Sequence, residues 1–103
     1  MSRDGHTLAG PHGPIRISGD ALSSLVVTAA ELVDGARARR PRRGVDVAIE
    51  GERVRVELEL AARYGTVLPE LARAVQDGVA AALRDATGLA VERVDVAVEE
   101  LDA

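Results

Sequence analysis

The clearest pattern in the chain is a strict alternation of apolar and charged residues through the segment 53–60. Apolar side chains occupy every second position, and the positions between them carry Arg or Glu. A period of two is typical of a strand that places one face on a core and the other in water. The segment 45–50 alternates in the same way, and Gly51-Glu52 lies between the two. The pattern therefore predicts a β-hairpin whose turn begins with Gly.

Two longer segments instead repeat their apolar residues every three or four positions, as an amphipathic helix does. The first predicted helix is capped by Ser18 or Asp20 and ends at Asp34-Gly35. The second opens near Thr66 and ends at Thr87-Gly88. Short alternations at 15–17 and 91–98 predict one further strand before the first helix and one after the second.

The predicted order is strand, helix, strand, strand, helix, strand. This order is that of an α+β domain of the ferredoxin-like or a related split-βαβ type, with a small mixed sheet and two helices on one face. The strands around Val54 and Val98 should be joined by a parallel crossover. Residues 1–13 are rich in Gly and polar residues and are expected to form a flexible lead-in, so that 14–101 is the single domain.

The amino-acid composition restricts the possible functions of the protein more than it restricts the possible folds. The 103 residues include no Phe, Trp or Cys and a single Tyr, so the core must be aliphatic and there is no thiol chemistry. No apolar run reaches the roughly 18 residues that cross a bilayer, and no secretory signal is evident. We therefore expect a cytoplasmic protein.

Residues suited to catalysis are scarce. His6 and His12 both fall in the lead-in, and two histidines alone do not make a metal site. No Ser has a base at a suggestive spacing, and no Gly-rich phosphate loop precedes a helix. The sequence predicts that the protein is not an enzyme and has no small-molecule substrate, no cofactor and no metal.

All thirteen basic residues are Arg, and five of them lie in one short segment that we expect to be a loop. They are Arg37, Arg39, Arg40, Arg42 and Arg43. This cluster is a candidate contact for an anionic surface, but a solubilising loop or one that pairs with the protein's own acidic body is equally consistent with it. The net charge of −4 and the near absence of aromatics argue against nucleic acid as the partner.

Two further features are candidates for protein contacts. One is the exposed strand face of Arg53, Arg55, Glu57 and Glu59, although such a face is often only solvated. The other is Gly78, in a strip of small residues on the second helix. A helical Gly costs about 1 kcal/mol relative to Ala, so it suggests either close approach in self-association or a harmless surface position.

The segment 64–76 resembles the hallmark of the alkaline-shock family of envelope stress response proteins, also called the general-stress or Gls type. In that family a strand ends in Tyr-Gly and a helix opens with Pro-Glu and runs on to Val-Gln. The matching residues here are Tyr64, Gly65, Pro69, Glu70 and Gln76, with Gly88 after the helix. Typical members have Ser at the position of Val67, where it would cap the helix; here Thr66 is expected to take over the cap.

The resemblance implies a bacterial, non-enzymatic protein of cell-envelope homeostasis. Related proteins self-associate and collect at the membrane through a small membrane-anchoring protein partner. Some relatives are instead linked to the control of acetyl-CoA carboxylase, which makes a regulatory subunit of a metabolic enzyme the second hypothesis. A nucleic-acid-binding domain that uses the Arg-rich segment is the third.

Overall fold

One long strand organises the structure. The computed structural model describes residues 5–10, 12–38 and 44–100. Strand β5 (Arg53–Ala62) pairs along one edge with two antiparallel strands in succession, β4 (Val45–Glu50) and then β3 (Ala36–Ala38). Along its other edge β5 pairs with β6 (Ala90–Glu100) in parallel. The sheet is therefore mixed, as predicted.

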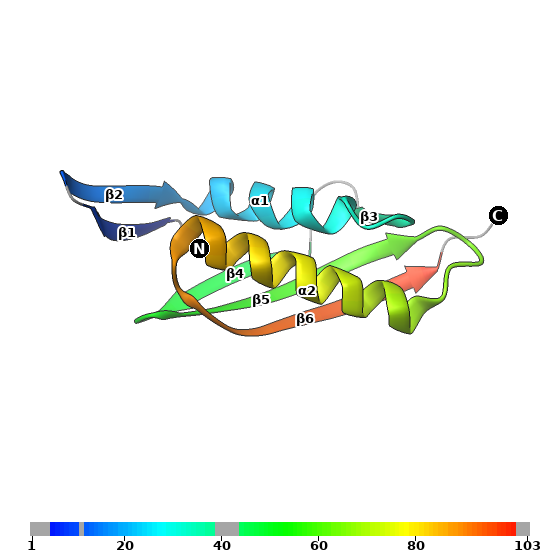
Figure 1. Cartoon of the computed structure of the whole chain (residues 1–103). Coiled ribbons are helices and arrows are strands. Elements are labelled where there is room, and N and C mark those ends of the chain that lie inside the picture. Colours follow the sequence, from blue (N-terminus) through cyan, green and yellow to red (C-terminus); the bar gives the residue numbers. More distant parts are fainter. Residues whose placement is uncertain (1–4, 11, 39–43, 101–103) are drawn as a thin grey trace.

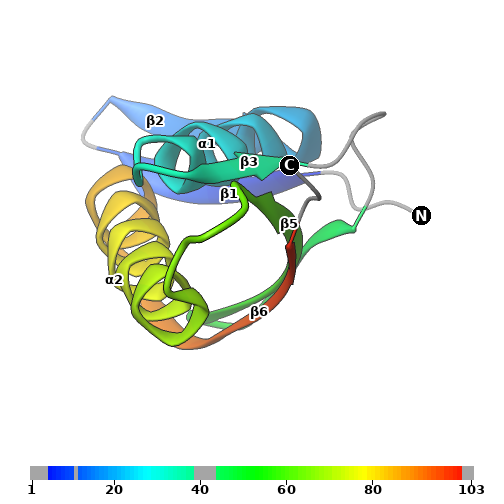
Figure 2. The same cartoon turned by 90° about the vertical axis from the view of Figure 1, so that its right-hand side faces the viewer.

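Helices α1 (Gly19–Glu31) and α2 (Leu68–Thr87) pack on one face of this sheet and against each other (Figures 1 and 2). The core between them is purely aliphatic. Its largest fully buried side chains are Leu58, Leu60, Leu83, Val26, Val54, Val56, Val75 and Val79. The α+β class and the placement of both helices on one face are thus confirmed.

The first predicted strand does form, but outside the main sheet. Strand β2 (Gly13–Ser18) pairs antiparallel with β1 (Gly5–Gly10), and the two make a separate two-stranded sheet. Figure 1 shows this hairpin projecting beyond the N-terminal end of α1. The ferredoxin-like prediction places that strand in the main sheet. Residues 1–13 are predicted to be a flexible lead-in, whereas residues 5–10 form β1. A hairpin needs only local pairing between neighbouring segments, so it forms without a place in the larger sheet.

Strand β3 corrects the prediction that residues 36–44 are all loop. Ala36 and Ala38 are buried, and the strand pairs with the C-terminal end of β5, where Ala36 lies opposite Ala62. Small side chains suit this position because α1 contacts β3 closely. Arg37 therefore lies in a strand, whereas Arg39, Arg40, Arg42 and Arg43 lie outside the described residues.

The two ends of α2 differ in how they are capped. Its N-cap is Val67, in extended conformation and without a side-chain hydrogen bond, so the expected cap by Thr66 is not observed. At the other end Gly88 adopts φ 72°, and its N–H donates to the carbonyl of Arg84. This left-handed conformation is the reason that Gly follows the helix.

Candidate protein-interaction surface

The face of the sheet opposite the helices carries nearly all the charged side chains of the strands. Alternation along β5 sends Val54, Val56 and Leu58 into the core and the residues between them to the other side. Strands β4 and β6 follow the same rule in register with β5. We call this surface the open sheet face. Its described charged residues are Arg37, Asp46, Glu50, Arg53, Arg55, Glu57, Glu59, Glu92, Arg93, Asp95 and Glu99.

Basic residues gather at the end of the open sheet face where β5 begins. Arg55 lies 3.5 Å from Glu50 across the β4–β5 pair and 4.0 Å from Glu92 of β6. Arg53 lies 3.9 Å from the same Glu92. These distances join side-chain nitrogen and oxygen atoms that are well exposed, so the pairs orient the side chains more than they stabilise the fold.

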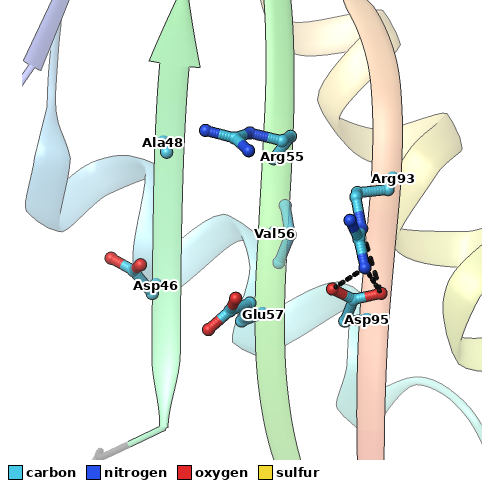
Figure 3. A pocket seen from close by; sticks show the side chains of 7 residues that line it. All are labelled: Asp46, Ala48, Arg55, Val56, Glu57, Arg93 and Asp95. Atoms are coloured by element: carbon cyan, nitrogen blue, oxygen red, sulfur yellow. Dashed lines mark hydrogen bonds and ion pairs between the residues drawn. The ribbon is translucent and has the colours of Figure 1, made fainter.

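One step further along the strands the charges become acidic. Asp46, Glu57 and Asp95 lie side by side across β4, β5 and β6, in one row of the register (Figure 3). Arg93 reaches Asp95 along its own strand, with a nitrogen–oxygen distance of 2.9 Å. Asp46 and Glu57 form no ion pair within the described part of the chain. This row lines a shallow depression of about 160 Å³ together with Arg55 and Arg93.

A β-bulge decides which charges become neighbours. The pairing runs Val54 with Val91 and then Arg55 with Arg93, so Glu92 is an extra residue on β6. The bulge turns Val94 toward the core, where it is buried opposite Val56, and so brings Arg93 beside Arg55. Without it, Glu92 would lie opposite Arg55.

The remaining predicted site residues that the structure describes divide between helix α2 and the open sheet face. Gly78 lies on the side of α2 that faces α1, since a Cβ built on it would lie 3.8 Å from the carbonyl oxygen of Ala29. This position indicates close helix packing within the chain. Arg37 is exposed, and it lies beside Ala61 of β5 on the open sheet face.

The family-motif residues hold the β5–α2–β6 crossover together. The N–H of Gly65 donates to a carboxylate oxygen of Glu100 at 2.9 Å, which ties the loop after β5 to the end of β6. The side chain of Gln76 donates to the carbonyl of Val94 at 3.0 Å, which ties α2 to the middle of β6. Pro69 lies in the first turn of α2, where its missing N–H costs nothing. The contacts of these motif residues therefore stabilise the fold.

The same motif also contributes to an exposed apolar end of the domain. Among the side chains that the structure describes, the large hydrophobic residues with the greatest exposure are Leu32, Tyr64 and Val67, at 81%, 62% and 57%. They come from the loops after α1 and after β5. These loops touch, because the N–H of Arg63 donates to the carbonyl of Gly35 at 2.9 Å. An ion pair of 3.0 Å between Arg63 and Asp34 adds to this contact.

Within 5–10, 12–38 and 44–100, no three His, Cys, Asp or Glu side chains are placed to hold a metal ion. No helix of that part of the chain is long and apolar enough to cross a bilayer. His12 is exposed in the turn between β1 and β2.

Comparison with known proteins decides the family. The model of the alkaline-shock protein family, described as having a cell envelope-related function, matches residues 17–103. The chain belongs to the alkaline-shock protein family. The resemblance that the 64–76 motif carries is thereby confirmed.

One relative is YloU of Bacillus subtilis (strain 168), a protein described as uncharacterized. It is 37% identical over 57 residues, which are 55% of this chain and 48% of YloU, so the match spans about half the length of that relative. Among solved structures, a doubly substituted MamM CTD is similar with a TM-score of 0.60 and 23% identity, over 82% of this chain and 84% of that one. A zinc form of the MamM CTD matches with a TM-score of 0.53 and 21% identity, over 82% and 87%. These two likenesses show a shared fold.

Sequence reasoning found the charged face of this alkaline-shock family member on β5 but missed its extension onto β4 and β6. The charged residues that it missed are Asp46, Glu50, Glu92, Arg93, Asp95 and Glu99. The alternation in each strand indicated which side chains share a face, but their neighbours depend on register and on the bulge at Glu92. Neither has a local signal in the sequence.

Proposed function

We propose that the protein is a non-enzymatic interaction module of the bacterial cell envelope, recruited to the inner face of the membrane by an anchoring protein partner. Membership of a family with a cell envelope-related function supports the cellular setting. The exposed apolar end supports binding of a protein.

Tyr64 is the observation that carries this proposal. It is the only aromatic residue in the chain, yet 62% of it is exposed while the core is built entirely from aliphatic side chains. Aromatic residues contribute disproportionately to protein–protein binding because they bury a large area with little loss of side-chain freedom. Val67 and Leu32 supply further apolar surface at the same end. A partner segment that covers this end would remove all three from water.

The test is affinity capture of the tagged full chain from detergent-solubilised membranes of its own organism, with bound proteins identified by mass. We expect a small transmembrane protein as the dominant companion of the wild type, and a several-fold loss of it with Y64A. D85A is the matched control, because Asp85 is exposed near the far end of α2. A companion that Y64A and D85A retain equally would show that the apolar end is not the binding surface.

The second candidate is a regulatory subunit of a metabolic enzyme such as acetyl-CoA carboxylase. The same capture distinguishes the two: carboxylase subunits in place of a transmembrane protein would favour regulation of that enzyme. Addition of the purified protein should then change the rate of the carboxylase.

A further inference from the structure

The charges of the open sheet face change sign along β5 in a symmetrical way. Arg53 and Arg55 are followed by Glu57 and Glu59 at alternate positions, which gives the charge series plus, plus, minus, minus. Read in the reverse direction the series is minus, minus, plus, plus, so each position then carries the opposite charge. The centre of this series lies between residues 55 and 57. An antiparallel copy of the strand, laid face to face, would therefore place a carboxylate opposite each Arg.

The side-chain charge along β6 changes from positive to negative at the same point of the register as it does along β5. Arg93 lies beside Arg55, and Asp95 lies beside Glu57, because the bulge at Glu92 sets this register. Both strands thus turn from basic to acidic across one line, which Figure 3 shows between Arg55 and Arg93 on one side and Glu57 and Asp95 on the other. The self-complementary pattern is a property of the sheet surface and not of one strand.

In a single copy this arrangement is electrostatically unfavourable. Arg55 has Arg93 as its neighbour, and Glu57 lies between Asp46 and Asp95. Like charges directly opposite each other on neighbouring strands are destabilising. The ion pair of Arg93 with Asp95 and the contacts of Arg55 with Glu50 and Glu92 offset this only in part. A surface of opposite pattern would relieve it.

We propose that the open sheet face binds the same face of a second copy of this chain. The two β5 strands run antiparallel, and a twofold axis passes between residues 55 and 57, so that Arg55 faces the partner's Glu57 and Arg93 faces the partner's Asp95. Sheets that pack face to face lie about 10 Å apart, a gap that an Arg and a Glu or Asp side chain span between them.

Charge favours a second copy over other partners. A uniformly basic segment would meet Arg53, Arg55 and Arg93, and a uniformly acidic one would meet Asp46, Glu57 and Asp95. Only a banded surface matches both halves, and the chain itself carries one. A symmetric dimer uses the same patch on both copies, as this pattern requires.

The size of the face predicts a weak dimer. Ten residues of β5 at about 3.3 Å each and three strands about 4.8 Å apart give roughly 450 Å² per copy. The total of about 900 Å² is below the 1,200 Å² or more of stable complexes. We therefore expect a dissociation constant in the micromolar range or weaker. Salt should weaken the dimer because the paired side chains are screened.

The experiment is sedimentation velocity of the purified full chain from about 10 to 500 μM at low salt, with five samples compared against the wild type. R55E and E57R should each abolish the dimer, because each places like charges opposite each other twice. The double variant R55E/E57R should dimerise as the wild type does, since it only exchanges the two signs. An equimolar mixture of R55E and E57R should form a heterodimer. R73E, on an exposed position of α2, is the control for the change in net charge.

Circular dichroism of each variant checks that it is folded. A wild type that is monomeric throughout this range would overturn the proposal. So would a dimer that R55E leaves intact, or a double variant that stays monomeric while folded. The measurement uses purified protein alone, so its outcome is independent of whether a membrane partner binds the apolar end.

Discussion

Helix α2 begins without a side-chain cap, and this can be corrected by one substitution. Val67 at the N-cap has φ −77° and ψ 103°, the extended conformation that a capping residue needs, but its side chain offers no acceptor. The next two positions are Leu68 and Pro69, and Pro69 has no N–H. A Ser at position 67 would therefore accept from the N–H of Glu70, and Glu70 could in turn accept from the N–H of residue 67. V67S thus creates a capping box.

The expected magnitude follows from two opposing effects. A Ser cap stabilises by about 1 kcal/mol relative to Ala at this position. Val67 is 57% exposed, so its removal forfeits less than half of the roughly 1.5 kcal/mol that a fully buried Val contributes. V67S should therefore be at least as stable as the wild type. It should exceed V67A by about 1 kcal/mol, or about 4–8 °C in Tm for a domain of this size.

Urea and thermal unfolding followed by circular dichroism measure both differences. V67S and V67A lose nearly the same apolar surface, so the difference between them isolates the cap. In an E70A background the advantage of V67S should shrink, because the reciprocal half of the box is gone. Equal unfolding midpoints for V67S and V67A would refute the assignment of Val67 as an uncapped N-cap.

Two further predictions concern stability, each measured by urea unfolding. G44A should destabilise more than G51A: both positions have positive φ, but a Cβ on Gly44 would lie 2.8 Å from the Cβ of Glu59, whereas one on Gly51 meets nothing within 4 Å. The excess should be about 1–3 kcal/mol, and equal losses would contradict it. T87V should cost about 1–3 kcal/mol although it preserves shape, because the buried hydroxyl of Thr87 accepts from the N–H of Leu89 at 3.1 Å and Val cannot. T87S keeps that bond, so a similar loss with T87S would show that packing and not the hydrogen bond is responsible.

The elements that rest on local periodicity could be predicted from the order of the residues alone. The alternation through 53–60 specified β5 and both of its faces, and the spacing of apolar residues specified two helices on one side of the sheet. It also determined that the other side is charged. These outcomes follow because a side chain's face depends only on its position within its own strand or helix. The motif at 64–76 indicated the family in the same way, because its residues lie close together in the sequence.

How those elements pair and pack could be seen only in the folded chain. Strand β2 pairs with β1 and not with the main sheet, and β3 pairs with the same edge of β5 as β4 does. Helix packing turned Gly78 toward α1. The bulge at Glu92 placed Arg93 beside Arg55 and Asp95 beside Glu57, and so made the open sheet face a banded surface. Register and packing depend on contacts between residues far apart in the chain, and no local pattern encodes them.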